Sequence, residues 1–105
     1  MKINWIYITT ASREEAEKIA ETVITEKLAA CANLLGDVTS MFHWKGTLCR
    51  EKEAVLILKT TEALTEELMA RVKSLHSYEC PCIVVLPIEQ GHLPFLQWVQ
   101  DEVRR

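Results

Sequence analysis

The sequence predicts a single α+β domain in which an antiparallel sheet carries two helices on one face. Segments rich in β-branched residues alternate with segments of helical periodicity, in the order β-α-β-β-α-β. The chain has 105 residues with three Gly and three Pro, and no low-complexity stretch or repeat divides it. We therefore expect one domain over residues 1–105.

The first strand and the first helix carry the clearest local signals. Ile3–Thr10 is rich in β-branched and aromatic residues, which predicts a strand. Ser12, with Glu15 three residues on, is a capping-box pattern that predicts the start of a helix. Apolar residues then recur at helical spacing, at Ala16, Ile19, Ala20, Val23, Ile24 and Leu28.

A long hairpin is predicted next. Lys45-Gly46 is a turn signal between two extended arms. The arms comprise Cys31–Leu35, Val38–Trp44, Leu48 and Ala54–Thr60. We expect the first arm to be irregular around Gly36-Asp37, since these residues disfavour a regular strand.

The remainder predicts a helix, a strand and a short last helix. Leu64, Leu68, Val72 and Leu75 recur at helical spacing, and the helix should end near His76. Cys82–Ile88 predicts a strand, and Pro87 within it indicates an edge position or an early end. Pro94 opens the last helix, with Phe95, Trp98 and Val99 on one side. This order is the split βαβ, or ferredoxin-like, plan with an added C-terminal helix.

The strands are apolar on both faces, although the two main helices cover only one. Val55–Leu58 and Ile83–Leu86 are continuous apolar runs, and Trp5–Ile8 is nearly so. Strands with one face in water should alternate apolar and polar residues. The last helix could hide part of the second face, but a second copy of the chain is the better cover. We therefore expect an obligate oligomer.

Composition excludes several classes of partner. The net charge is −3, from 12 basic and 15 acidic residues, and the adjacent basic pair Arg104-Arg105 stands at the chain end. A nucleic-acid-binding protein would gather its basic residues on one face, so we expect no nucleic acid partner. No apolar run approaches the ~20 residues of a membrane span, so we expect no membrane partner.

The start of the chain predicts a compartment, and the compartment predicts the oxidation state of the cysteines. Met1–Thr10 lacks the pattern of a signal peptide, so we expect a cytoplasmic protein. The four cysteines, Cys31, Cys49, Cys80 and Cys82, are then expected to be reduced thiols and not a disulfide framework.

The link between the second helix and the last strand is the best site candidate. His76 offers an imidazole, Tyr78 a phenol and Glu79 a carboxylate, while Cys80 and Cys82 offer thiols. Imidazole and thiolate suit copper or zinc, so we take His76, Glu79 and Cys82 as candidate metal ligands. The alternative is that His76 caps the preceding helix and Tyr78 packs the link.

Cys80-Pro81-Cys82 has its own two interpretations. In an extended segment, residues two apart point to the same side, so both thiols could reach one metal. Structural zinc usually has four ligands, and the others would come from Cys49, a histidine or another subunit. The alternative is that both cysteines act as small apolar residues.

A ligand cleft is a further hypothesis, built on Trp44, Lys59 and Tyr78. Lys59 ends an apolar strand, and a buried lysine needs a partner. Glu79 or Glu89 could be this partner, or Lys59 could face an anionic ligand between subunits. Trp44 is either an interface anchor or a stacking surface for a ligand. His43 and His92 are taken as solvated side chains.

Enzyme hypotheses find little support. The chain has no P-loop and no Gly-x-Ser-x-Gly elbow, and Arg13 has no Gly-rich loop beside it to hold phosphate. A nucleophile pair of Cys80 with His76 stays open. We expect no catalytic residues and no obligatory cofactor, with a divalent metal as the possible one.

Motifs along nearly the whole chain resemble one family, the CutA divalent-cation tolerance proteins. They are Lys27-Leu28-Ala29-Ala30-Cys31-Ala32-Asn33, Ser40-x-Phe42-x-Trp44-Lys45-Gly46, Leu58-Lys59-Thr60-Thr61, His76-Ser77-Tyr78-Glu79-Cys80-Pro81-Cys82-Ile83, Pro87-Ile88, Gly91 and Leu96-x-Trp98. The resemblance implies a homotrimer similar in architecture to the PII signalling proteins. It also implies a role in tolerance to divalent metals, copper above all.

The sequence departs from the family where metal matters. Some bacterial relatives have a Cys, a His and a Glu at the positions of Ile8, Leu75 and Cys82. The copper ligands proposed for those relatives therefore do not carry over. The predicted function is a trimeric divalent-metal-binding protein of copper type. The alternatives are a PII-like sensor of a small anionic metabolite between subunits and a trimeric scaffold that presents its hairpin tips.

Overall fold

The computed structural model describes residues 1–104. Its elements are β1 (Ile3–Thr10), α1 (Arg13–Thr25), β2 (Cys31–Trp44), β3 (Thr47–Thr61), α2 (Glu62–Leu75), β4 (Ile83–Ile88) and α3 (Leu93–Glu102). This order confirms the predicted β-α-β-β-α-β plan with its C-terminal helix. Several boundaries differ from the prediction. Helix α1 ends at Thr25, before Leu28, and β3 is one continuous strand that includes Ala54–Thr60. β4 begins at Ile83, and Pro94 is the second residue of α3.

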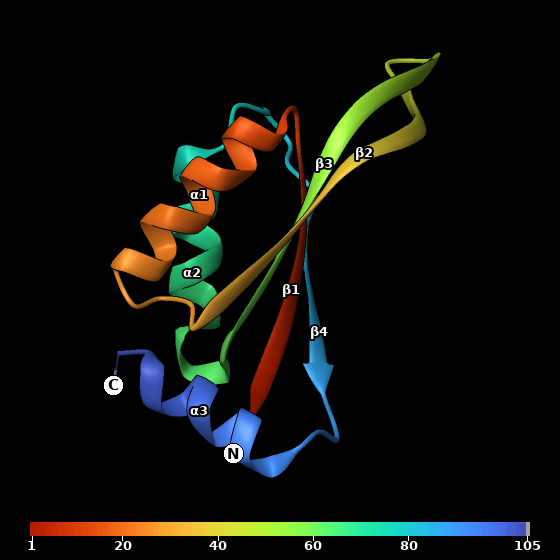
Figure 1. Ribbon diagram of the computed structural model, residues 1–105. Coiled ribbons are helices and arrows are strands. Elements are labelled where there is room, and N and C mark those ends of the chain that lie inside the picture. Colours follow the sequence, from red (N-terminus) through yellow and green to blue (C-terminus); the bar gives the residue numbers. More distant parts are fainter. Residues whose placement is uncertain (105) are drawn as a thin grey trace.

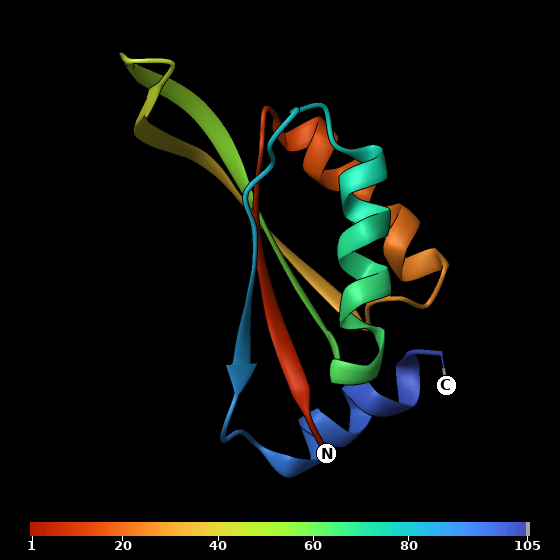
Figure 2. The ribbon, with the colours of Figure 1, turned by 180° about the vertical axis from the view of Figure 1, so that it is seen from behind.

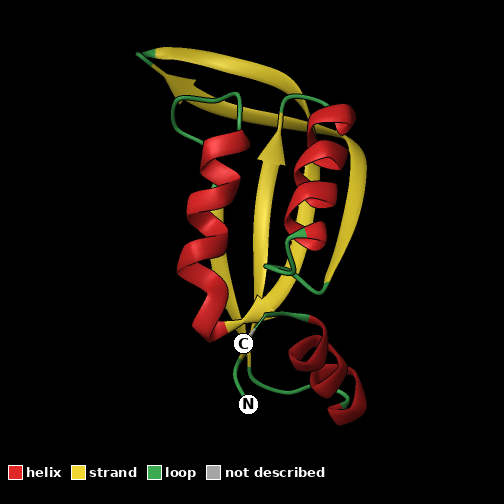
Figure 3. Ribbon diagram, turned by 90° about the vertical axis from the view of Figure 1, so that its left-hand side faces the viewer, coloured by secondary structure: helices red, strands yellow, loops and turns green. Residues whose placement is uncertain are grey.

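The four strands form one antiparallel sheet in the order β2-β3-β1-β4. Helices α1 and α2 lie side by side on one face, and α3 lies across the end of the sheet where β1 begins (Figures 1 and 3). This arrangement confirms the ferredoxin-like class. β4 is an edge strand, as Pro87 predicts, because a proline cannot donate a backbone hydrogen bond to a second neighbouring strand.

The capping signal at the start of α1 is confirmed in a modified form. Ser12 Oγ accepts a hydrogen bond from the Glu15 N–H at 3.1 Å, as expected for a capping serine. Glu15 Oε1 reaches back to the N–H of Ala11, at 2.9 Å, one residue before the cap. The first bond satisfies an N–H that the first helical turn leaves without a partner, and the second ties the residue before the cap to the helix.

The core lies between the sheet and the two main helices. Alternate residues of the central strands point toward the helices, as the period of two requires. The fully buried members are Ile6, Ile8, Leu56 and Leu58 from the sheet, with Ile19, Val23, Leu68 and Val72 from the helices. A smaller cluster packs Leu96 and Val99 of α3 against Ile3.

No helix covers the second face of the sheet (Figures 1 and 2). Tyr7 lies there between Val84 and Ile57 in the strand register. Val84 is 48% exposed, Leu86 44% and Leu35 53%. The last helix leaves this face open, so the apolar strands predicted to need a cover do lack one within the subunit.

The β2–β3 hairpin projects well beyond the rest of the sheet (Figures 1 and 2). Its pairing shifts between Leu35 and Val38, and Asp37 has a φ of 56° at this irregularity, as expected around Gly36-Asp37. The turn uses Lys45 and Gly46 at positive φ. The molecule is therefore elongated, with extents of 44 × 26 × 22 Å.

Candidate functional site

A groove of about 730 Å³ lies where the uncovered sheet face continues onto the hairpin. One wall is the segment 77–82 between α2 and β4, and the other is the hairpin. Its lining consists of Thr9, Ser40, Met41, Phe42, Trp44, Cys49, Glu51, Glu53, Ser77, Tyr78, Glu79, Cys80 and Cys82. These residues come from three separate parts of the chain, which the fold brings together.

The strand register explains which hairpin side chains line the groove. Alternate residues of β3, namely Cys49, Glu51 and Glu53, continue the row that begins with Val55 on the uncovered face. Ser40 pairs with Glu51, so it belongs to the same face. Glu53 was missed as a site residue. The two-residue repeat of a strand could have predicted it, because the repeat places the Glu53 carboxylate on the same face as Val55.

His76 lies behind the groove and is bound through both ring nitrogens. Its side chain has 0% exposure. Nε2 lies 2.7 Å from the Thr9 carbonyl, and Nδ1 accepts the Tyr78 N–H at 3.1 Å. These bonds correspond to the neutral tautomer with its proton on Nε2. A metal could bind His76 only after one of the two hydrogen bonds had broken.

Tyr78 joins the loop to the hairpin. Its hydroxyl donates a hydrogen bond to Glu53 Oε2 at 2.7 Å, and Glu53 is 8% exposed. Burial, and then the neighbouring Glu53 carboxylate, raises the pKa of Tyr78 well above its ordinary value. The phenol therefore stays protonated and holds the Glu53 carboxylate at the groove wall.

Glu15 anchors the same loop from the start of α1. Its Oε2 accepts the Ser77 N–H at 2.7 Å, while its other oxygen bonds Ala11. Burial opposes ionisation, but the hydrogen bonds from Ser77 and Ala11 outweigh it, so the pKa of Glu15 is lowered. The sequence indicated only the capping role of Glu15, because the contact with Ser77 spans 62 positions.

The groove is acidic and rich in sulfur. Glu51, Glu53 and Glu79 line it with three thiols, from Cys49, Cys80 and Cys82, and no lysine, arginine or histidine is among the lining residues. Such a surface attracts cations and repels anions. Within residues 1–104, no group of three or more His, Cys, Asp or Glu side chains is placed to hold a metal ion. The potential ligands share the groove without forming a closed metal site.

The structure brings together four of the predicted site residues. Trp44, Tyr78, Glu79 and Cys82 all line the groove, whereas Lys59 does not. Trp44, Lys59 and Tyr78 were expected to share one ligand cleft, but Lys59 lies outside the groove that Trp44 and Tyr78 line.

Lys59 lies on the uncovered sheet face, in register with Trp5 and Cys31. Its Nζ donates a hydrogen bond to Asn33 Oδ1 at 2.5 Å. Asn33 is therefore its partner, and the expectation of Glu79 or Glu89 is wrong for the subunit. Burial raises the pKa of the adjacent Cys31, although Lys59 acts in the opposite direction.

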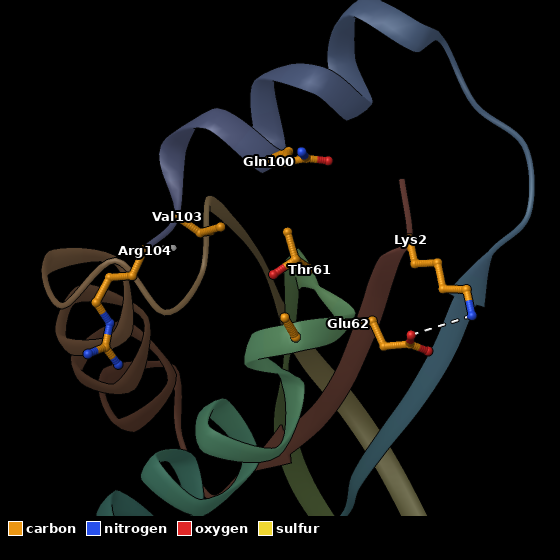
Figure 4. Close-up of a pocket in the computed structure, with 7 residues that line it drawn as sticks. Lys2, Thr61, Glu62, Gln100, Val103 and Arg104 are labelled. Atoms are coloured by element: carbon orange, nitrogen blue, oxygen red, sulfur yellow. Dashed lines mark ion pairs between the residues drawn. The ribbon is translucent and has the colours of Figure 1, made fainter.

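A second hollow, of about 370 Å³, lies between the start of α2 and α3 (Figure 4). Its cations have carboxylate partners in the same chain. Lys2 Nζ lies 3.6 Å from Glu62, and Arg104 pairs with Glu67 on α2. This pairing neutralises the positive charge, so we do not consider the hollow a candidate site.

The fold and the groove define the class: a small ferredoxin-like subunit with an open apolar sheet face and an acidic, thiol-bearing groove beside it. The chain belongs to the CutA1 divalent ion tolerance protein family, whose sequence profile matches residues 4–102.

Relatives support this assignment over most of the chain. The divalent-cation tolerance protein CutA of Archaeoglobus fulgidus is 43% identical over 100 residues, which is 95% of this chain and 97% of the relative. The Thermus thermophilus protein of the same name is 40% identical over 96 residues, covering 91% and 93%. The chain spans about half the length of other relatives, covering 56% of the chloroplastic rice protein CutA 1 and 53% of human CutA.

Solved structures confirm the fold. A CutA1 structure from Oryza sativa has a TM-score of 0.96 at 35% identity, covering 99% of this chain and 95% of that one. A divalent cation tolerance protein from Thermus thermophilus has a TM-score of 0.94 at 37% identity, covering 97% and 99%. A further neighbour, from Archaeoglobus fulgidus, is described as periplasmic; it has a TM-score of 0.93 at 42% identity, covering 97% and 99%. In the described part of this chain, no helix is long and apolar enough to cross a membrane.

Proposed function

We propose that the chain is a non-enzymatic, homotrimeric protein of the cytoplasm that binds divalent metal ions of copper type and contributes to metal tolerance. One observation carries the proposal: the groove has three carboxylates and three thiols among its lining and no basic side chain. Its charge and ligand chemistry suit a cation and disfavour an anion. The relatives named for divalent-cation tolerance support the same role.

Glu79 and Cys82 are the proposed metal ligands at the wall of the groove. Both are exposed residues of its lining, so an ion could reach them from solvent. His76 holds the loop from behind, and it joins the ligands only if its bond to Thr9 or to the Tyr78 N–H breaks. Copper and zinc both accept such a mixed set of ligands.

The uncovered sheet face supports assembly with sister copies. Leu35, Val84 and Leu86 are each 44–53% exposed on this face. Removing apolar surface from water stabilises an assembly by about 25 cal/mol per Å². Exposed apolar patches of this kind mark interaction sites. Because the groove continues from the same face, a sister copy would border it and could contribute further ligands.

Lys59 favours a second candidate function, a PII-like sensor that binds a small anionic metabolite between subunits. Its hydrogen-bond partner Asn33 is neutral, so its charge is not compensated by a carboxylate through that bond. An anion held between a sister copy and the sheet face would compensate the charge of Lys59.

A trimeric scaffold would present its hairpin tips to a partner. The hairpin residues Met41 and Leu48 are 61% and 64% exposed, so both are accessible for such a contact.

Titration calorimetry of the purified protein with copper(II), zinc(II) and a panel of nucleotides tests the proposal. We expect the metals to bind and the nucleotides to remain silent. Glu79→Gln should weaken metal binding at least tenfold, whereas Glu89→Gln, an exposed residue outside the groove lining, should not change it. If the parent protein bound a nucleotide and no metal, and Lys59→Gln lost the nucleotide, the sensor function would replace the metal function.

A further inference from the structure

We propose that Cys80 and Cys82 together form a two-thiolate site for a soft, thiophilic metal ion on the wall of the groove. The proposal rests on the metal-binding function above and narrows the class of ion that the groove takes. It assigns the first contact to the two thiols, with Glu79 beside them as a source of negative charge.

Both cysteines belong to the lining of the same groove. Cys80 and Cys82 are exposed, reduced and part of the lining of one groove. They are separated by Pro81 alone, whose ring fixes its φ near −65° and so limits how far the two cysteines can turn apart. Two thiols on a short stiff segment are therefore presented to a single ion.

The segment that carries them is held at both ends. On one side the Ser77 N–H is bound to Glu15 at 2.7 Å, and the Tyr78 hydroxyl is bound to Glu53 at 2.7 Å. On the other side Ile83 begins β4 and pairs with Ile8. The thiols therefore lie on a positioned loop, which lowers the entropy lost when an ion binds.

The ligand chemistry distinguishes this pair from the carboxylates of the groove. Thiolates are soft ligands and select soft ions, while carboxylates suit harder ones. Across the groove the hairpin contributes one more cysteine, Cys49, to the lining. Its thiol donates a weak hydrogen bond to the Thr47 carbonyl at 3.6 Å.

Within residues 1–104 no three His, Cys, Asp or Glu side chains are placed to hold a metal ion together, so the proposed site uses two protein ligands. A soft ion first binds the sulfurs of Cys80 and Cys82, and each thiol loses its proton to solvent as its metal–sulfur bond forms. Two protons are thus released for each ion at the first step, and affinity rises with pH.

Cadmium(II) titration of the reduced protein tests the site, because thiolate–cadmium bonds give a charge-transfer absorption that carboxylates do not give. The protein is desalted under anaerobic conditions, and a count of four reactive thiols in denaturant shows that all its cysteines are reduced. We expect the absorption to saturate at one ion per chain. Cys80→Ser and Cys82→Ser should each weaken it at least tenfold, and Cys31→Ser should leave it unchanged.

The outcomes separate the two-thiolate site from the broader proposal. No thiolate absorption, or equal absorption in Cys80→Ser and Cys82→Ser, overturns the site. If zinc still binds in calorimetry and is lost in Glu79→Gln, the divalent-metal function survives that result. If zinc and copper are also silent, both proposals are wrong. Light scattering and circular dichroism of each variant establish that it remains folded and assembled like the parent protein.

Discussion

Tyr78 and Glu53 join the two walls of the groove, with 2.7 Å between the phenol oxygen and the carboxylate. Tyr78 belongs to the segment that precedes β4, and Glu53 belongs to β3, so this bond ties the loop to the hairpin. Glu53 is 8% exposed and needs a donor at this depth. The bond thus connects the two walls of the groove at the point where Glu53 and Tyr78 line it.

Tyr78→Phe should destabilise the protein by about 1–3 kcal/mol, because it leaves the Glu53 carboxylate buried without its donor. Urea denaturation measures the change. Tyr7→Phe is the matched control, since the Tyr7 hydroxyl has no hydrogen bond within residues 1–104 and its ring lies on the open sheet face. Equal losses in the two variants would contradict the role of the Tyr78 bond.

Local signals were sufficient to predict most of the fold. The cap at Ser12, the turn at Lys45-Gly46 and the edge position of Pro87 each depend on neighbouring residues alone, and the structure has all three. The strands that are apolar on both sides do have one face that no helix of the subunit covers (Figure 1), and the oligomer expected to cover it stays a prediction. A local sequence signal is reliable where the backbone geometry it requires is itself local.

The site was predicted only in part, because its contacts join distant segments. The bond between Tyr78 and Glu53 spans 25 positions, and that between His76 and Thr9 spans 67. No spacing rule predicts which nitrogen of His76 meets a carbonyl, or that Lys59 meets Asn33. Sequence indicated the loop and the chemical groups that the structure places in the groove, but the assignment of their hydrogen-bond partners required the folded chain.

Glu15→Gln should destabilise the protein at neutral pH by about 1–2 kcal/mol, since it weakens the bonds to Ser77 and Ala11. The pKa of Glu15 is lowered in the folded state, so its stabilising contribution is present above the unfolded pKa of about 4.3 and is lost as pH falls through the folded pKa. Urea midpoints of the parent and Glu15→Gln should therefore converge in acid. Glu14→Gln, an exposed neighbour, should behave like the parent throughout.

His76→Ala should cost about 2–4 kcal/mol of stability, because it leaves a cavity and removes the partners of the Thr9 carbonyl and the Tyr78 N–H. Thermal and urea unfolding measure the loss. His43→Ala, an exposed histidine of the hairpin, should change stability by less than about 0.5 kcal/mol. If His76→Ala were as stable as the parent, the buried histidine would not hold the loop, and a role as a metal ligand would become the better explanation for it.

Leu86→Asp should break the assembly while the subunit remains folded. Leu86 is 44% exposed on the open sheet face, so the single chain tolerates a charge there, but a covered interface does not. Light scattering should report a fall from three chains to one. Ile24→Asp is the control, because Ile24 is 37% exposed on α1, on the opposite side of the sheet. If Leu86→Asp remained a trimer, the interface would lie elsewhere on the subunit. If the parent protein were monomeric at high concentration, no site shared between copies could exist.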